Sequence, residues 1–451
     1  MSSITDFALC QFCAKLKINY HGQVVANLTY VTLSIDSIIE ERCLRDAEAT
    51  LLSHALVGVL LLLGSDSISL LIVGTITNSL NLFYQVSKGE SLRNILLFMA
   101  SVNIFCSATN ILGSSYALLP ISWFNIWISL FILTGIAEVL FSMRYLEVLD
   151  ILLLFTLISA IPATMVAINS PDAIRDFLNL TVFLLAILTR PKRVDKSNIF
   201  QGLTISAFAA ATIVIVQCVL FLAFGVKLGN LVQPQNRIAF GGIFIDISHL
   251  SLFFASVAAL YYKRKPLIFL FYFAASVATS ARTGVVAFLA YTVLDIATSK
   301  SKAASKIRSI AWIICSVATA LYLFSYIRPD ILTETGRLKS FTTGLSTFMA
   351  NPLVGVGLGI ENYAQTVGVT IPHNAIIQFL AQGGIILGVP FSLVYILLFR
   401  LSAQALHVSP FAASLFIVLV GGLFVPEITN SRFIIPVAIA CLAELNLRRK
   451  Q

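Results

Sequence analysis

The sequence predicts an all-α integral membrane protein, a polytopic helical bundle of about 12 to 14 transmembrane helices. The first observation behind this prediction is composition. Of the 451 residues, 58% are hydrophobic and 11% are charged, whereas a soluble protein has roughly 25% charged residues. The second observation is a mean hydropathy of +0.91. The third is that apolar segments near the roughly 20 residues needed to span a bilayer recur along most of the chain.

Residues 1–48 differ from the rest of the chain because they are mixed and polar. They lack the basic stub, short apolar core and small-residue cleavage site of a signal peptide. We therefore expect a cytoplasmic N-terminal segment over residues 1–48 and a single transmembrane domain over residues 49–450. The expected spanning segments lie near residues 51–64, 68–86, 94–117, 121–141, 149–167, 174–189, 199–225, 244–262, 266–280, 284–298, 309–327, 373–398, 410–426 and 432–446.

The basic residues predict the orientation of the bundle. Four clusters fall on one face, and positive clusters mark the cytoplasmic side of a membrane protein. From residue 190 onward, the predicted inside segments contain fifteen Lys and Arg residues and the outside segments contain seven. Both termini are then cytoplasmic, and residues 328–372 form a long extracytoplasmic loop. The clusters are RPKRVDK (190–196), KRK (263–265), KSKAASKIR (300–308) and RRK (448–450).

These loops also account for the formal net charge of +9. No basic face alternates with aromatic residues, so a nucleic-acid partner is not expected.

The cysteines do not indicate a function. Cys10 and Cys13 form a lone CQFC motif, which is weak evidence for metal or redox chemistry without a second pair. We expect no disulfide framework and no cofactor.

Two patterns stand out in the loop 328–372. The segment NPLVGVGLG (351–359) predicts a turn punctuated by Pro and Gly. Its glycines do not match a nucleotide-binding fingerprint, because no strand precedes them and no phosphate-binding lysine follows. Ahead of that segment, apolar residues at helical spacing predict a short amphipathic helix lying along the membrane surface. These residues are Leu338, Phe341, Leu345, Phe348 and Met349.

Four ionisable residues fall on the predicted outer face and form the candidate site: Arg237, Arg282, Arg337 and His373. Arg282 lies in a tight turn between two short apolar segments, and an ionisable group held near hydrocarbon suggests function. Guanidinium groups can bind phosphate oxygens bidentately, so three arginines suit a di-anionic ligand anchored in lipid, such as a lipid-linked pyrophosphate. His373 can accept a proton near neutral pH. Asn374 could orient His373 or bind a sugar hydroxyl.

Each of these residues also has a structural explanation. Arg237 could be an interfacial anchor whose charged end reaches water. Arg282 could cap a helix hairpin or pair with a lipid headgroup. Arg337 could form a surface ion pair with Glu334, and His373 could be a solvated residue at the start of a helix. Three other polar residues are interpreted as structural: His249, Glu361 and Arg432.

Four stretches between residues 230 and 400 carry a family resemblance. They are NRIAFGGIF (236–244), SARTG (280–284), TGRLKSF with NPLVGVGLG (335–359), and HNAIIQFLAQGGIILG (373–388). In order, spacing and residue type, they resemble the bacterial O-antigen polymerases and O-antigen ligases, which assemble surface polysaccharides on lipid carriers. The first 230 residues share only a compatible hydropathy with that family.

The resemblance implies a metal-independent glycosyltransferase of the bacterial cytoplasmic (inner) membrane, with its active site facing the periplasm or the outside. The donor would be an undecaprenyl-pyrophosphate-linked oligosaccharide. The partners would be the bilayer, and a flippase and chain-length regulator of the same pathway. Arg282 and Arg337 match family arginines thought to hold the undecaprenyl pyrophosphate. His373 matches the family histidine that activates or positions the acceptor hydroxyl.

One position departs from the ligase pattern. Three residues after Gly384, that pattern has Gly, Thr or Tyr, whereas this chain has Leu387. We therefore expect a polymerase of O-antigen, capsule or exopolysaccharide before a ligase that transfers polymer to lipid A core. An oligosaccharide-lipid transporter is a further alternative, although transporters usually place binding groups near the bilayer midplane and often contain inverted repeats.

Overall fold

The computed structural model describes residues 67–104, 122–141, 146–191, 194–232, 238–298 without 243 and 245, single residues between 307 and 318, and residues 336–448. All of them belong to the second of two units, Met1–Glu48 and Ala49–Gln451, into which the chain divides. The predicted span at 51–64, most of the span at 309–327, the CQFC motif and Arg237 lie outside the described residues.

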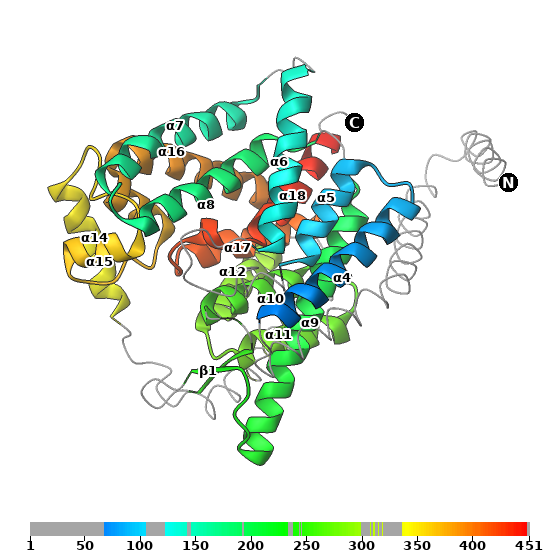
Figure 1. The fold of residues 1–451 in the computed structure, drawn as a ribbon. Coiled ribbons are helices and arrows are strands. Elements are labelled where there is room, and N and C mark those ends of the chain that lie inside the picture. The colour runs from blue at the N-terminus through cyan, green and yellow to red at the C-terminus, as the bar shows by residue number, and fades with distance from the viewer. Residues whose placement is uncertain are drawn as a thin grey trace. The chain divides into compact units, whose positions relative to one another are not determined.

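The described chain is almost entirely helical (Figure 1), which confirms an all-α architecture at that level. The helices are α4 (Ser67–Ser87), α5 (Leu92–Val102), α6 (Trp123–Phe141), α7 (Val148–Val166), α8 (Pro171–Leu188), α9 (Lys196–Phe224), α10 (Ile247–Tyr261), α11 (Pro266–Ala278), α12 (Arg282–Thr298), α14 (Arg337–Ala350), α15 (Ile360–Val367), α16 (Ala375–Gln404), α17 (Pro410–Gly422), the 3₁₀ turn η2 (Ile428–Asn430) and α18 (Ile434–Arg448).

Four helices are long and apolar enough to cross a membrane: α6, α7, α9 and α16. Helices α5, α10, α11, α17 and α18 are apolar but shorter. Every predicted span that falls on described residues corresponds to a helix or to part of one. The finer prediction of about 12 to 14 crossings stays a prediction, because length and composition single out four helices in the described part of the chain.

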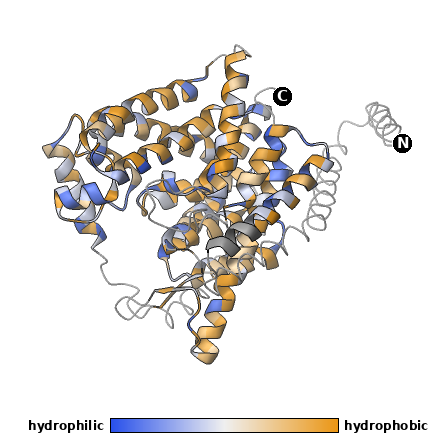
Figure 2. Cartoon of the chain, viewed as in Figure 1, coloured by the Kyte–Doolittle hydropathy of each residue, from blue (hydrophilic) through white to orange (hydrophobic). Residues whose placement is uncertain are grey.

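Apolar side chains on outward faces are consistent with a lipid environment. On α7, Ile151, Phe155 and Ile158 are exposed, whereas Leu153 and Ala160 are buried. Figure 2 shows the same distribution more widely, with hydrophobic residues all along most helices. Large contiguous apolar surfaces are rare on soluble monomers, so the outward faces of these helices fit a bilayer better than water.

One short hairpin departs from the all-α prediction. Strands β1 (Asn230–Val232) and β2 (Ala239–Gly242) pair antiparallel. The Gln217 side chain on α9 accepts a hydrogen bond from the Gly242 N–H at 2.8 Å and so fixes β2 against the helix. Each strand is too short to produce a recognisable alternation of apolar and polar residues, which explains why the sequence did not predict it.

Small residues bring the starts of α10 and α12 together. Helix α10 packs against α11, α12 and α17. The Ser251 hydroxyl lies 2.9 Å from the Ser276 hydroxyl and donates to the Ala281 carbonyl at 3.2 Å. A side chain at Gly284 would overlap Ser251, so close helix packing depends on that glycine. Ser280, with φ of 58°, forms the tight turn that leads into α12.

Helix α16 is broken at Gly384, whose φ of 58° and ψ of −156° are not helical. The segment NPLVGVGLG (351–359) crosses the break and bonds to the backbone groups that the helix leaves free. The Gly357 N–H donates to the Gln382 carbonyl at 2.8 Å, and the Ile385 N–H donates to the Pro352 carbonyl at 2.8 Å. The predicted turn therefore does more than connect two elements, because it holds both halves of α16.

Candidate binding and catalytic site

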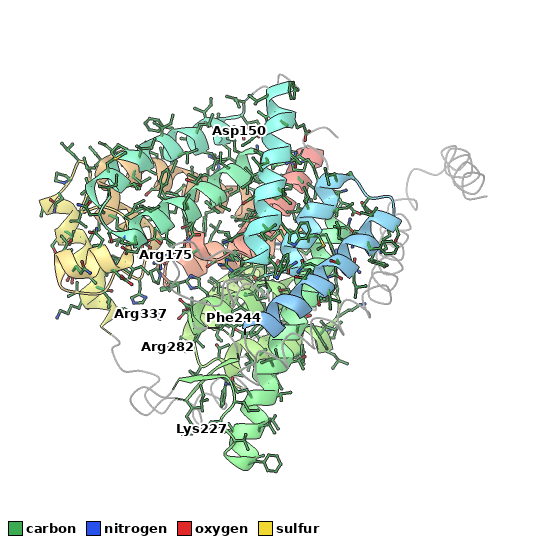
Figure 3. All side chains as sticks on the ribbon, viewed as in Figure 1. Asp150, Arg175, Lys227, Phe244, Arg282 and Arg337 are labelled. Carbon is green, nitrogen blue, oxygen red and sulfur yellow. The ribbon has the colours of Figure 1, made fainter. Side chains whose placement is uncertain are left out.

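The candidate site lies at one end of the bundle, which we name the site end. It is formed by the first turns of α8, α10, α12, α16 and α18, by the start of α14, and by the connection 423–433 between α17 and α18. A hydrogen bond of 3.2 Å from Asn374 Nδ2 to the Leu423 carbonyl joins the start of α16 to this connection. Figure 3 labels Arg175, Arg282 and Arg337, which appear in the same region of this view.

A cavity of about 290 Å³ opens between α8, α10 and the connection 423–433. Its apolar wall includes three aromatic side chains, Phe244, Phe253 and Phe433. Its polar wall combines carboxyl, imidazole, amide and guanidinium groups. The residues that supply these groups are Asn179, Asp246, His249, Glu427, Asn430 and Arg432.

Asp246 and His249 form a hydrogen-bonded pair on this wall. His249 Nδ1 lies 2.7 Å from Asp246 Oδ2. The other oxygen, Oδ1, caps α10 by accepting from the Ser248 and His249 N–H groups at 2.8 and 3.0 Å. Burial alone would raise the pKa of Asp246, but the imidazole and the two N–H donors outweigh it and hold the pKa well below its usual range. The carboxylate therefore keeps a proton on Nδ1.

The His249 ring also contacts the connection 423–433. Burial alone would lower the pKa of His249, but the Asp246 carboxylate and hydrogen bonds with the backbone of Pro426 and Glu427 outweigh it and raise that pKa. His249 therefore links the start of α10 to the connection 423–433.

Glu427 is a buried acid in the connection 423–433. Its backbone has a φ of 53°, which is uncommon for a residue other than glycine and often marks a functional position. Its Oε2 accepts from Asn430 Nδ2 at 2.7 Å. Burial, followed by the charge of Asp176 and a hydrogen bond with the Asp176 side chain, raises the pKa of Glu427 well above its usual value. Glu427 and Asp176 therefore form a pair of hydrogen-bonded carboxyl groups beside the cavity.

His373 lies in the turn before α16, next to the start of α14. Burial lowers the pKa of His373, Arg337 lowers it further, and Asp246 opposes this shift. These influences place the imidazole close to both charged groups. A side chain at Gly344 of α14 would overlap Pro372, so α14 packs tightly on this turn. Nδ1 of His373 is buried and has no hydrogen-bond partner among the described residues.

The structure treats the predicted site residues differently. The charge of Arg337 acts on His373, and Arg282, which is partly buried, begins α12 at the same end. Arg237 lies outside the described residues. Asn374 is the N-cap of α16, where its oxygen accepts from two backbone N–H groups at 3.1 Å and its nitrogen donates to Leu423. This amide is already occupied, so its geometry does not favour the predicted contact with a sugar hydroxyl.

Sequence reasoning missed the cavity and interpreted His249 and Arg432 as structural. Two signals were present in the sequence. Asp246 and His249 stand three residues apart at the start of an apolar segment, which places them on one helix face. Glu427 is an isolated acid between two apolar segments. Within the described ranges, no group of three or more His, Cys, Asp or Glu side chains is arranged to hold a metal ion.

Sequence comparison assigns the chain to no family. The chain matches no family model, and no curated protein is similar to it in sequence. The fold and the site define a class instead: an all-α protein with apolar helices able to span a membrane and a polar cavity, flanked by a histidine and an arginine, at one end of its bundle.

Proposed function

We propose that the protein is a membrane-embedded polysaccharide polymerase, a glycosyltransferase that joins oligosaccharide repeat units linked to undecaprenyl pyrophosphate. In this proposal it extends O-antigen, capsule or exopolysaccharide at the outer face of a bacterial cytoplasmic membrane. The observation that carries the proposal is the packing of α14, which begins at Arg337, against the turn that contains His373, where a side chain at Gly344 would overlap Pro372. Burial and then Arg337 lower the pKa of His373, which favours a neutral imidazole that can accept a proton.

In the proposed reaction, arginines stabilise the leaving pyrophosphate and a histidine accepts or directs a proton. Arg282 and Arg337, helped by Arg237, neutralise the pyrophosphate as the bond between the anomeric carbon and its oxygen breaks. His373 accepts or directs the proton of the attacking sugar hydroxyl. Direct displacement inverts the anomeric centre. The scheme requires no metal ion, because the guanidinium groups supply the positive charge.

The outward face of α14 supports a substrate that arrives from lipid. Its inward face is small and polar, with Ser340, Gly344 and Thr347 buried. Its outward face is apolar, with Leu338, Phe341, Leu345 and Met349 exposed. A helix of this kind lies in a membrane interface with its apolar face towards the acyl chains. Because Arg337 begins α14, it would sit where a lipid-anchored pyrophosphate leaves the bilayer.

An O-antigen ligase is the second candidate, because it would use the same donor and the same leaving group. The two activities differ in the acceptor, and Leu387 departs from the ligase pattern described above. Deletion of the gene separates them. Loss of a polymerase leaves single repeat units attached to the lipid A core, whereas loss of a ligase leaves bare core and polymer on the carrier.

A transporter of lipid-linked oligosaccharide is favoured by one observation, the break in α16 at Gly384. Broken helices often form the substrate sites of transporters. Here the freed backbone groups bond to the segment 351–359, so this break does not leave them available to a substrate. The ionisable groups described above gather at the site end instead. Transfer chemistry therefore explains the arrangement better than transport.

The proposed function is tested with two variants of the candidate site and one control variant on α14. Arg337→Ala and His373→Ala are assayed in membranes that contain carrier-linked repeat units, and polymer is followed as a ladder on gels. We expect each variant to lose at least about 100-fold in chain extension. Lys339→Ala removes one exposed positive charge from the same helix and should extend chains normally. Near-normal polymer from Arg337→Ala or His373→Ala would reject the role given to that residue.

A further inference from the structure

Two carboxyl groups fix the connection 423–433 to α8. Helix α8 packs against the 3₁₀ turn η2 in this connection, and the side chains of Asp176 on α8 and Glu427 before η2 are hydrogen-bonded to each other. Glu427 Oε2 also accepts a hydrogen bond of 2.7 Å from Asn430 Nδ2. An ionised carboxyl group has no hydrogen to donate, so the contact between the two acids requires a proton on at least one of them.

The surroundings of the two acids favour that proton. Both side chains are largely buried, and two carboxylates that share a buried site repel each other. Burial and the Asp176 carboxyl therefore raise the pKa of Glu427, although Arg175 opposes the shift. Arg175 Nε is 3.7 Å from Asp176 Oδ1. A rise in pH replaces an attractive contact between α8 and the connection with a repulsive one.

The backbone of Glu427 makes the connection sensitive to this change. Its φ of 53° is sparsely populated by residues other than glycine, and such a conformation persists only where surrounding contacts impose it. The hydrogen bond between the two acids is one of those contacts. Its loss therefore favours a different backbone conformation at Glu427.

The same connection holds the first turns of α16, which directly follow His373. The Glu427 N–H donates to Gln378 Oε1 at 2.7 Å. The Leu423 carbonyl accepts from Asn374 Nδ2 at 3.2 Å, and the Asn374 oxygen caps α16. A change at Glu427 is therefore transmitted by two hydrogen bonds to the start of α16 and to the turn that contains His373.

We propose that Glu427 is a positioning residue, and that the proton it shares with Asp176 keeps the connection 423–433 in the arrangement that places His373 for catalysis. This inference rests on the proposed function, in which His373 accepts or directs the proton of the attacking hydroxyl. Glu427 acts on the reaction through Gln378 and the start of α16. At alkaline pH the shared proton passes to solvent, the two carboxylates separate, and chain extension slows.

Several other groups could change the charge around Glu427 as the pH changes. Helix α16 presents an uncharged amide, Gln378, to its backbone. His249 contacts the backbone of Glu427, so loss of its proton must be separated from loss of the shared one. The titratable and charged groups that face Glu427 are Asp172, Arg175 and Asp176 on α8, Asp246 and His249 on α10, and Arg432 in the connection itself.

The experiment uses the full-length protein in lipid nanodiscs and measures conversion of carrier-linked repeat units to polymer from acidic to alkaline pH. We expect the alkaline limb of the profile to move upward by about one pH unit or more in Glu427→Gln and in Asp176→Asn. An amide donates a hydrogen bond at any pH, so either variant keeps the contact without a shared proton. The acidic limb, which belongs to His373, should stay in place.

Two further variants test whether the effect is specific. Glu361→Gln removes an exposed acid of α15 and should leave both limbs unchanged. Glu427→Ala removes the contacts with Asp176 and Asn430 together and should lose about 10- to 100-fold in rate at every pH. Binding of undecaprenyl pyrophosphate, the carrier without sugar, should persist in Glu427→Ala, which also shows that the variant folds. Recovery of the rate by glutamine but not by alanine is the result expected for a positioning residue.

Amide hydrogen exchange provides a measurement that does not depend on polymer formation. At alkaline pH, the amides of residues 423–433 should lose protection in the unsubstituted protein and keep it in Glu427→Gln. The two proteins are compared at the same pH, so the intrinsic pH dependence of exchange cancels.

The outcomes distinguish the inference from the proposed function. An alkaline limb that is absent, that stays in place in Glu427→Gln, or that moves in only one of Glu427→Gln and Asp176→Asn would overturn the inference. Loss of activity in His373→Ala would still leave the polymerase standing. If the unsubstituted protein makes no polymer, the proposed function fails, and equal exchange in the unsubstituted protein and Glu427→Gln would then reject the shared proton as well.

Discussion

The two ends of the helical bundle use the same kinds of side chain in opposite ways. At the end away from the cavity, buried charges are paired. Arg190 is buried with Asp150 and also lies 3.0 Å from Glu147. Asp295 accepts from Lys263 at 2.7 Å and contacts His407. At the site end, by contrast, two acids, Asp176 and Glu427, lie against each other, and His373 Nδ1 is buried without a hydrogen-bond partner among the described residues.

This difference distinguishes ionisable groups that are paired within the fold from groups that the fold alone does not satisfy. A buried charge costs free energy unless a partner satisfies it. The opposite end meets that requirement within the chain, so its ion pairs are explained by folding alone. The site end does not, and it combines these groups with a cavity of about 290 Å³. Residue type alone cannot make this distinction, because both ends contain a histidine beside an aspartate.

The largest expected effect comes from breaking the paired end. Arg190→Met leaves the buried Asp150 carboxylate without its cation, and removing one partner of a buried pair costs about 3 to 5 kcal/mol. We expect a large fall in the thermal unfolding midpoint in detergent, and partial recovery in the double variant with Asp150→Asn. Arg175→Met at the site end should cost less, because the 3.7 Å contact of Arg175 with Asp176 is longer than the contacts of Arg190. Equal losses at both ends would contradict the comparison.

A smaller effect is expected at the backbone crossing that holds the site end. Gly384→Ala would place a methyl carbon 2.3 Å from the Leu353 carbonyl carbon, at a residue with φ of 58°. We expect a loss of about 2 to 3 kcal/mol from strain and overlap together, measured as a lower unfolding midpoint. Gly336→Ala is the control, because Gly336 also has positive φ, 71°, but nothing lies within 4 Å. That variant should lose only about 1 kcal/mol. Similar losses would mean that close packing of the segment 351–359 against Gly384 does not stabilise the fold.

Much of the fold could be predicted because hydrophobic length and periodicity are local properties. The apolar segments became helices, and the amphipathic helix predicted from Leu338 to Met349 is α14. The break in α16 could not be predicted, because it depends on the segment 351–359 binding across Gly384. The hairpin of β1 and β2 was missed because its strands are too short to show an alternating pattern, and its position depends on Gln217 of α9.

The sequence could predict only those features of the site that follow from the order of the spans. Placing Arg337 and His373 on one face required the order of the spans alone, and their joint role in a site stays a prediction. A pocket shared with Arg237 stays a prediction. The cavity depends on long-range packing, because His249 and Glu427 meet across it from opposite halves of the domain. Asn374 could have been interpreted correctly, since asparagine is among the preferred N-cap residues.

The smallest effect on stability is expected for Glu427→Gln. Burial and the Asp176 carboxyl raise the pKa of Glu427, so folding favours the protonated acid, and glutamine matches that form in shape. We expect the unfolding free energies of the variant and the unsubstituted protein to agree within about 1 kcal/mol at acidic pH, where the carboxyl is protonated in both the folded and the unfolded state.

The sign of the pH dependence sharpens this last prediction. A group whose pKa is raised by folding contributes stability at low pH and loses it as the pH rises through the folded-state value. As the pH rises above the ordinary range of a glutamate, the unsubstituted protein should therefore lose stability relative to Glu427→Gln. Glu444→Gln is the matched control at the opposite end, where the carboxylate contacts Lys196 at 3.3 Å. It should be less stable than the unsubstituted protein near neutral pH. Parallel curves for Glu427→Gln and the unsubstituted protein would show that this carboxyl is already ionised, and the site end would then differ less from the opposite end than the geometry indicates.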